Sequence, residues 1–246
     1  MTTPLWVVVP AYQEAAGISD TLDCLAAQTD RSFTLVVVEN GSTDGTADVA
    51  RRFVAVAPFP VHVIEELEQG VGCAADTGFR YAIARGAMML VRTDADCLPH
   101  SEWVAAARAA LAAGAGMVCG RLRARRDENG LLVRAGFVVL VVLANALGKL
   151  RPSNRDRAFR APYRMHAGNN MAITAELYLA VGGMPRRAAP TDQIFRNRVR
   201  RRTAAIVYSR AMVVENSTRR LKKYGVLGTA RWYLDRGSGG LTPDPR

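Results

Sequence analysis

The first 120 residues repeat one pattern of hydrophobic and polar positions. A short run of apolar, often β-branched residues is followed by a turn and then by a segment with apolar residues at helical spacing. The pattern predicts strands over residues 5–9, 34–38, 61–65, 87–92 and 116–119, with helices near residues 18–25, 75–83 and 101–113. Strands that are apolar on both faces need helices on both sides. The alternation therefore predicts an α/β fold with a doubly wound, mostly parallel central sheet.

After residue 120 this alternation breaks down. Residues 151–164 are rich in Pro, Arg and Asn, which is typical of a loop. Order returns with a strand and helix predicted between residues 167 and 181, a helix over 192–201, and two strands at 204–208 and 211–215. We therefore expect residues 1–120 and 121–236 to be two halves of one compact domain, the second an α+β region, and residues 237–246 to be a disordered tail.

Residues 135–148 form a membrane-like stretch of 14 uncharged residues between Arg134 and Lys149. A helix that crosses a bilayer needs about 20 apolar residues. We therefore expect a buried or interfacial helix here and no transmembrane span.

The amino-acid composition and the charge distribution limit the classes of protein to which the chain can belong. The 246 residues are 49% hydrophobic and 22% charged, which is too apolar for a disordered chain and too polar for a protein with many membrane spans. The net charge of +11 is unevenly placed: residues 1–120 hold 7 Arg and 14 acidic residues, net −7, and residues 121–246 hold 26 Lys and Arg and 8 acidic residues, net +18. A basic half points to phosphates, nucleic acid or an anionic membrane surface.

The cysteines and the N-terminus indicate a cellular compartment. Four cysteines without a CxxC pair, together with three histidines, predict neither a structural zinc site nor a disulfide scaffold. Only five apolar residues precede Pro10, too few for the apolar core of a signal peptide. We expect a reduced, cytoplasmic protein.

Polar residues follow three of the predicted strands. PAYQE follows the first strand, ENGSTDGT the second and DAD the fourth. Carboxyl ends of parallel strands meet at one edge of a sheet, where ligands bind. No GxGxxG follows the first strand and no GxxxxGK[ST] occurs, so neither a dinucleotide site nor a P-loop is predicted. Ser42 or Thr43 is expected to cap the next helix, with Asp44 in its first turn.

Asp94 and Asp96 are the sharpest local feature. Two carboxylates two residues apart repel each other unless a cation lies between them or they face different ways. A hard divalent ion, with pyrophosphate oxygens and water completing its shell, would relieve that repulsion. The alternative is a solvated acidic turn.

Together these motifs resemble those of the family 2 glycosyltransferases of the GT-A fold. VVVPAYQE resembles the opening strand and its PxYNE-like turn, VVVENGSTDGTADVA resembles the VDDGSxDGT segment, and GVGCAADTGFRYA resembles the small-residue helix after the third strand. DAD matches the DxD position, and AGNNMAI…LAVGGMP…TDQI resembles the acceptor-side block that ends in an acidic ED pair. Five motifs in the family's order are more specific than any one alone.

The resemblance implies a nucleotide-sugar-binding half that ends after the DxD motif and an acceptor-side half that follows it. Pro10, Tyr12 and Glu14 would form the donor-binding turn, with Tyr12 offering an aromatic face to the base. Glu39 stands where the family usually has an Asp that bonds the base, and Asp76 would bond the ribose or an Arg instead. A uridine donor is favoured over a guanosine donor.

The resemblance also implies a metal. Asp94 would reach the ribose or sugar hydroxyls, and Asp96 would ligate Mg²⁺ or Mn²⁺ that bridges the two phosphates. Asp94 and His166 are further candidate ligands, although a lone His is more often structural. Arg219 and Arg220 resemble the late arginines that approach the donor diphosphate. The alternative for these two arginines is a solvated basic run.

Asp192 is the implied general base, which removes the proton from the acceptor hydroxyl and so gives inversion. The pair reads Thr191-Asp192 instead of Glu-Asp, so the base is kept and its neighbour is lost. The alternative is that Asp192 only begins a helix. Arg231-Trp232 resembles the end of the QxxRW signature of processive synthases, but Gly228 replaces its Gln. Transfer of a single sugar is therefore expected.

The predicted function is an inverting, metal-dependent glycosyltransferase that moves a sugar from a nucleotide-diphosphate sugar to an acceptor hydroxyl. One alternative is a nucleotidyltransferase of related fold, which usually needs a glycine-rich loop that PAYQEAAG does not supply. Another is a basic, non-catalytic module that binds RNA or an anionic membrane. Acidic residues at three strand ends favour the enzyme, and we expect no nucleic acid partner. An anionic or lipid-linked acceptor, peripheral contact with the inner face of the membrane, and a homodimer all stay open.

Overall fold

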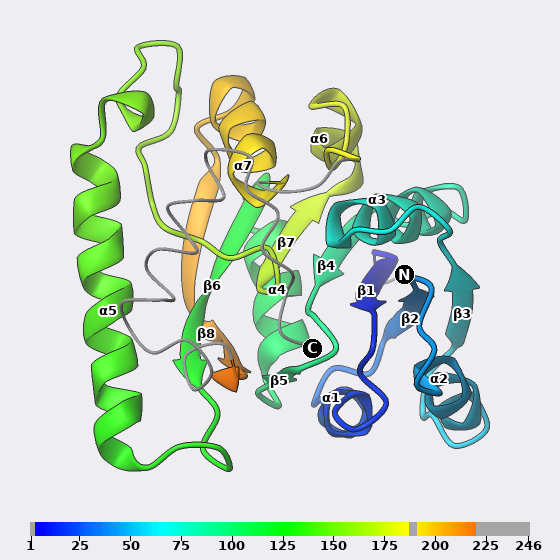
Figure 1. The fold of residues 1–246 in the computed structure, drawn as a ribbon. Coiled ribbons are helices and arrows are strands. Elements are labelled where there is room, and N and C mark those ends of the chain that lie inside the picture. The colour runs from blue at the N-terminus through cyan, green and yellow to red at the C-terminus, as the bar shows by residue number, and fades with distance from the viewer. Residues whose placement is uncertain (1–2, 187–190, 220–246) are drawn as a thin grey trace.

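An eight-stranded sheet forms the centre of the computed structural model, which describes residues 3–186 and 191–219 (Figure 1). Its order is β3-β2-β1-β4-β7-β6-β8-β5. The strands are β1 (Leu5–Ala11), β2 (Phe33–Glu39), β3 (Val61–Glu65), β4 (Met89–Arg92), β5 (Cys97–Pro99), β6 (Met117–Ala124), β7 (Met171–Thr174) and β8 (Ile206–Asn216). The helices are α1 (Ile18–Ala26), α2 (Thr46–Val54), α3 (Val71–Ile83), α4 (Trp103–Ala112), α5 (Leu131–Leu150), the 3₁₀ turn η1 (Pro152–Asn154), α6 (Ala175–Ala180) and α7 (Thr191–Arg202).

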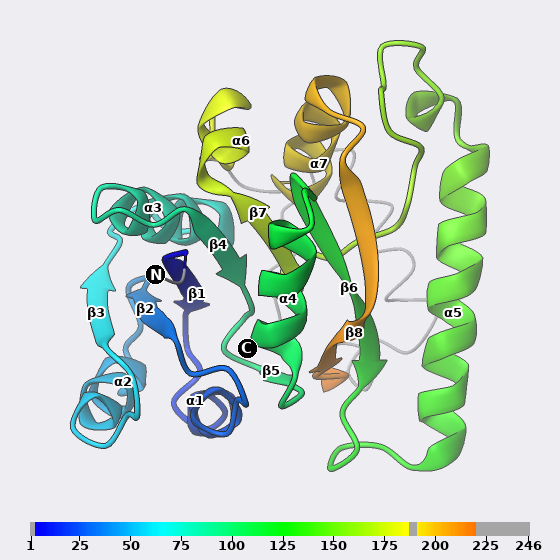
Figure 2. The ribbon, with the colours of Figure 1, turned by 180° about the vertical axis from the view of Figure 1, so that it is seen from behind.

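The sheet is mixed but mostly parallel, which confirms the predicted fold class. β1 pairs in parallel with β2 and β4, β2 with β3, and β6 with β8, whereas β7 is antiparallel to its neighbours β4 and β6 and β5 is antiparallel to β8. Alternate side chains of β1 enter two separate cores: Val7 and Val9 pack with α1, α2 and α4, and Val8 packs with α3, α6 and α7. Helices therefore cover both faces of the sheet, as the two opposite views show (Figures 1 and 2).

The boundaries of several elements differ from the predictions. β1 continues through Pro10 and Ala11, and β6 continues to Ala124, so residue 120, the predicted boundary between the two halves, lies inside a strand. β5 was not predicted, because three residues carry too little pattern. The two strands expected at 204–208 and 211–215 are one strand, β8, whose register shifts opposite Gly120 and Arg121. This β-bulge interrupts the alternation of side chains between the two faces of the sheet. The sequence pattern therefore predicted two strands instead of one.

Helix α5 overturns the expectation for the apolar segment. It has 20 residues with mean hydropathy 2.2, and among the described residues it is the one helix long and apolar enough to cross a membrane, by length and composition only. Of its apolar window 6% is buried. Of the two predicted alternatives, the buried helix was wrong, and the interfacial helix stays a prediction. The helix is also longer than the 14 uncharged residues on which the prediction rested. The predicted tail, residues 237–246, lies outside the described residues.

Candidate active site

The carboxyl ends of β1, β2 and β4 meet at one pocket. It is lined by Pro10, Ala11, Tyr12, Glu14, Asn40, Val71, Ala74, Asp94, Ala95 and Asp96. The first of the predicted donor-binding motifs and the DAD motif therefore share a pocket. Val71 and Ala74 come from the first turns of α3, which packs so closely on the sheet that a Cβ at Gly78 would collide with Val8.

Hydrogen bonds from the GSTDGT loop hold the turn that follows β1. Gln13 adopts a positive φ of 52°, its backbone N donates to Ser42 Oγ at 3.1 Å, and its side-chain Oε1 accepts from the backbone N of Thr43 at 3.0 Å. The backbone N of Ala15 donates to Asp44 Oδ2 at 2.9 Å. Asp44 Oδ1 also accepts from the backbone N of Thr46, the first residue of α2, at 3.1 Å. The expectation that Ser42 or Thr43 caps this helix was therefore wrong, since Asp44 lies before α2 and binds its first amide.

Glu39 and Asn40 hold loops together. Glu39 accepts from the backbone N of Gly41 at 3.1 Å and from that of Ser42 at 2.5 Å, so its longer side chain turns back onto its own loop. The side chain of Asn40 donates to the carbonyls of Glu66 and Glu68 and accepts from the backbone N of Gly70. Glu39 is not among the residues that line the pocket with Asp94, although Asn40 is. Each oxygen of Glu39 accepts one of these hydrogen bonds.

Asp76 faces away from the pocket. Its buried carboxylate accepts from the hydroxyl of Tyr178 at 2.6 Å and from Arg80 Nε at 2.8 Å, and Arg186 Nη1 lies 3.8 Å away. The predicted arginine partner is therefore present, whereas nothing brings Asp76 to the residues that line the pocket. In this structure it ties α3 to α6.

Arg92, at the end of β4, joins the two sides of the site. Its side chain is 1% exposed, and its Nε and Nη2 donate to Asp94 Oδ1 at 3.0 and 2.9 Å, while its Nη1 lies 3.5 Å from Asp192 Oδ1. Burial opposes the charge of Arg92, but attraction from Asp94 and Asp192 outweighs it and raises the pKa of the guanidinium. For Asp94, burial together with Asp96 and Asp192 raises the pKa despite Arg92. Arg92 was not predicted, although a cation in an apolar strand, two residues before Asp94 and so on the same side of the chain, was a usable signal.

Asp192 lies in the first turn of α7 and remains 41% exposed. The backbone N of Gly168 donates to its Oδ2 at 3.2 Å, and a Cβ at Gly168 would collide with this carboxylate. The loop and Arg92 together hold the candidate base in one place. Thr191, which replaces the Glu of the ED pair, is buried against Gly72 at the start of α3.

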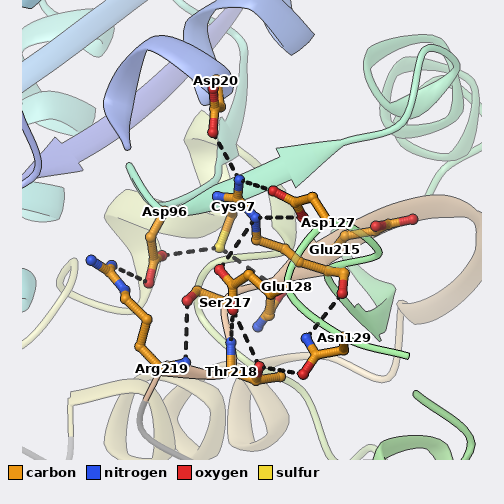
Figure 3. A network of polar contacts seen from close by, with 12 residues as sticks. Asp20, Asp96, Cys97, Asp127, Glu128, Asn129, Glu215, Ser217, Thr218 and Arg219 are labelled. Carbon is orange, nitrogen blue, oxygen red and sulfur yellow. Dashed lines mark hydrogen bonds and ion pairs between the residues drawn. The ribbon is translucent and has the colours of Figure 1, made fainter. Parts of the chain in front are cut away.

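Arg219 bridges the turn after β1 and the DAD motif. Figure 3 shows its contact with Asp96. Its Nη2 donates to Glu14 Oε1 at 2.6 Å and to Asp96 Oδ2 at 3.1 Å. Burial opposes the charge of Arg219, but the hydrogen bond to Glu14 and attraction from Glu14 and Asp96 raise its pKa. The neighbouring Thr218 is fixed by hydrogen bonds to Glu128 and Asn129, which places Arg219 at this edge. Arg220 lies outside the described residues.

His166 is buried beside the candidate base. Neither of its ring nitrogens has a hydrogen-bond partner among the described residues. Burial, followed by the charge of Arg196, lowers its pKa to about 4, while Asp192 acts in the opposite direction. The charged groups that shift the pKa of His166 therefore lie around Asp192 and Arg92, on the acceptor side of the site.

Comparisons with known proteins identify the family of the chain. The sequence profile described as Glycosyl transferase family 2 matches residues 6–177, more than half of the chain. The chain belongs to this family. It is 34% identical over 100 residues to the glycosyltransferase AglE of Haloferax volcanii, covering 40% of this chain and 32% of AglE, so it matches about a third of that relative's length.

Two solved structures share the fold of this family 2 glycosyltransferase. The mannosyltransferase PcManGT from Pyrobaculum calidifontis, in complex with GDP-Man and Mn²⁺, has a TM-score of 0.67 at 24% identity, covering 99% of this chain and 66% of that one. The glucosyl-3-phosphoglycerate synthase from Mycobacterium tuberculosis, in complex with Mn²⁺, UDP-glucose and phosphoglyceric acid, has a TM-score of 0.57 at 21% identity, covering 99% and 82%. The predicted GT-A fold is confirmed, and the family match favours the transferase over both alternative functions.

The carboxylates of this glycosyltransferase fit a divalent cation in part. Asp96 lines the pocket and its side chain is 33% exposed, and a carboxylate oxygen is a ligand that Mg²⁺ and Mn²⁺ accept. Asp94 is already engaged by Arg92. Among the described residues no group of three or more His, Cys, Asp or Glu could hold a metal ion. Asp96 is therefore the side chain best placed to hold a cation, whose remaining ligands would come from a diphosphate and water.

Proposed function

We propose that the protein is an inverting, metal-dependent glycosyltransferase that moves a single sugar from a nucleotide-diphosphate sugar to an acceptor hydroxyl. The observation that carries this proposal is the buried guanidinium of Arg92, which contacts Asp94 on the donor side and Asp192 on the acceptor side. A transferase needs a leaving-group site and a base on opposite sides of the reacting carbon, held in fixed relative positions.

The donor would lie in the pocket lined by Tyr12, Glu14, Asp94 and Asp96. Tyr12 offers an aromatic ring to the base, and Arg219, already at the rim of this pocket, offers a guanidinium to the diphosphate. One structural relative was crystallised with GDP-Man and another with UDP-glucose, which supports a nucleotide-sugar donor of either base. Uridine remains our prediction for this chain.

Asp96 would hold Mg²⁺ or Mn²⁺ when the donor binds. A bound divalent ion offsets the negative charge that develops on the leaving diphosphate. Arg219 donates to Oδ2 of Asp96 at 3.1 Å, so a cation bound at this oxygen would displace the guanidinium. The freed guanidinium can turn to the phosphate oxygens.

Asp192 would take the proton from the acceptor hydroxyl. Its carboxylate is partly exposed, so an acceptor can reach it, and it is held by Arg92 and the backbone N of Gly168. A carboxylate accepts the proton of a hydroxyl through one of its oxygens. Because the base acts on the face of the sugar opposite the leaving group, a direct displacement inverts the anomeric carbon.

A donor screen tests this function without knowledge of the acceptor. Purified protein is mixed with UDP-sugars and GDP-sugars, with and without Mn²⁺ or Mg²⁺, and its melting temperature is followed. A ligand at about 100 times its Kd stabilises the folded state by about 2.7 kcal/mol. We expect stabilisation by at least one donor only with metal, loss of it in Asp96→Asn, and no change in the control Asp48→Asn, whose side chain lies on the surface of α2. Absence of any donor effect would overturn the proposal.

A product assay separates the nucleotidyltransferase alternative. A glycosyltransferase releases a nucleoside diphosphate from the donor, whereas a nucleotidyltransferase consumes a nucleoside triphosphate and a sugar phosphate and releases pyrophosphate. Detection of pyrophosphate release would favour the alternative.

A further inference from the structure

The apolar face of α5 points outward. Its half-buried and buried positions recur at helical spacing and include Arg134, Phe137, Asn145 and Gly148. The positions between them carry exposed apolar side chains: Leu132, Val139, Val142, Leu143, Leu147 and Leu150, each more than half exposed. The half-buried side chains of Leu140, Val141 and Ala144 are apolar too, so α5 is apolar on both faces. A surface helix of a water-soluble protein normally carries polar side chains on its outer face. In both views α5 forms the outer edge of the described part of the molecule, beside β6 (Figures 1 and 2).

Specific contacts on its inner face fix α5 in this orientation. Asn145 Oδ1 accepts from the backbone N of Met165 at 2.9 Å, and the side chain of Asn154 donates to the carbonyl of Gly148 at 2.8 Å. A Cβ at Gly148 would collide with the ring of Tyr163, so the helix and the loop touch directly. Rotation of the helix to bury its apolar face would break all of these contacts. These contacts therefore keep the apolar face of α5 on the surface of the protein.

The chain beside the C-terminal end of α5 is strongly basic. Residues 149–160 hold five Lys and Arg and one acidic residue, Asp156. All five cationic side chains are exposed, and Asp156 is engaged by Arg201 at 3.1 Å. The surface of an anionic bilayer has negatively charged headgroups above an apolar interior. Cations beside an exposed apolar helix face are complementary to such a surface.

We propose that α5 docks the protein onto an anionic lipid bilayer, with the helix lying in the plane of the interface. Spanning is disfavoured, because Asn145 and Gly148 attach the inner face of the helix to protein and a spanning helix would have to detach. Docking leaves the fold intact and immerses only the outward apolar side chains. This surface is separate from the proposed donor site, and the docking holds or fails independently of the transfer reaction. It also gives a structural basis for the predicted peripheral position on a membrane.

The test is sedimentation of the full chain with vesicles of phosphatidylcholine alone and of phosphatidylcholine mixed with phosphatidylglycerol. We expect binding to the anionic vesicles. The double variant Val139→Asp/Leu143→Asp should lower it by roughly tenfold or more, because two charges enter the apolar face. The control Leu67→Asp places one such charge at an exposed leucine outside α5 and should leave binding unchanged. The double variant Arg151→Gln/Arg155→Gln should weaken binding to anionic vesicles by roughly tenfold.

Circular dichroism melting of each variant shows whether the fold is kept. Because the substituted side chains are exposed, we expect melting close to that of the wild type. No binding of the wild type to anionic vesicles would overturn the proposal. So would equal losses in Leu67→Asp and the α5 variant. A dimer in sedimentation velocity that Val139→Asp/Leu143→Asp dissociates, without vesicle binding, would assign the surface to a second copy of the chain instead.

Discussion

Arg92 and Asp192 are 100 positions apart in the sequence, yet Nη1 of Arg92 lies 3.5 Å from Oδ1 of Asp192. The same guanidinium donates two hydrogen bonds to Asp94. A single buried cation thus links the turn of the DAD motif to the first turn of α7. The donor side and the acceptor side of the site cannot shift apart without leaving a carboxylate unpaired.

Loss of this cation should destabilise the fold strongly. In Arg92→Met, the carboxylates of Asp94 and Asp192 lose their shared partner. Breaking a fully buried ion pair from one side costs about 3–5 kcal/mol, and the partial exposure of both carboxylates sets this as the upper bound. Urea unfolding measures the change. The control Arg51→Met removes an exposed ion pair with Asp48 and should cost at most about 1 kcal/mol. Equal costs for the two variants would show that Arg92 does not hold the site together.

Gly168→Ala should impair turnover with little effect on donor binding. The added Cβ would collide with the carboxylate of Asp192, which must move away from its place between Gly168 and Arg92. Displacement of a reacting group by about 1 Å can lower a rate about 100-fold. The control Gly136→Ala adds a Cβ that meets nothing within 4 Å. Rates measured as nucleoside diphosphate release should separate the two variants, and full activity of Gly168→Ala would argue against Asp192 as the base.

His166 should make stability depend on pH. The folded protein holds this side chain neutral down to about pH 4, the lowered pKa being caused first by burial and then by Arg196, whereas the unfolded chain takes up a proton near pH 6.5. Between these values the unfolded state binds more protons, so stability falls as the pH falls. Between about pH 7 and pH 5 the loss should be about 2 kcal/mol.

Urea unfolding at the two pH values gives this slope directly. His166→Gln should remove about 2 kcal/mol of the pH dependence. His62→Gln, at a histidine stacked on Trp6, should retain it because His166 is intact. An unchanged slope in His166→Gln would contradict the assignment.

Arg219→Ala should weaken binding of the donor diphosphate. A hydrogen bond to a charged group contributes about 1.5–3 kcal/mol, so the Kd for UDP or GDP with Mn²⁺ should rise by roughly tenfold to a hundredfold. Removal of Arg219 also frees Asp96 from the contact at 3.1 Å, so the metal concentration that gives half-saturation should not rise. Isothermal titration calorimetry measures both quantities. Arg52→Ala, an exposed arginine of α2, serves as the control, and an unchanged Kd in Arg219→Ala would place the diphosphate elsewhere.

Local patterns were sufficient for the parts of the site that lie at strand ends. The apolar runs of β1, β2 and β4 located the edge where Tyr12, Glu14 and Asp96 meet, because the carboxyl ends of parallel strands share an edge. The Arg92–Asp192 contact could not be predicted, since it depends on the register of β4 against β7 and on the path of the loop that carries Gly168. For Asp76 the family resemblance implied a bond to the ribose or to an Arg, and the rotation of α3 directs it to Arg80 and Tyr178.

The same limit applies to α5. Its composition predicted a helix, whereas the direction of its apolar face follows from the contacts of Asn145 and Gly148 with a loop up to 20 residues further along the chain. The spacing of apolar residues in one segment does not show which other segment of the chain it packs against.

The central claim is that this site transfers a sugar with inversion, with Asp192 as base and Asp96 as metal ligand. The most direct measurement is ¹H NMR of the sugar first released from the donor that the screen identifies, in the presence of Mn²⁺ and with water as acceptor. The released sugar should have the anomeric configuration opposite to that of the donor. Asp192→Asn should slow its release about 100-fold or more. Release of the sugar with the donor's own configuration, or at an unchanged rate in Asp192→Asn, would contradict it.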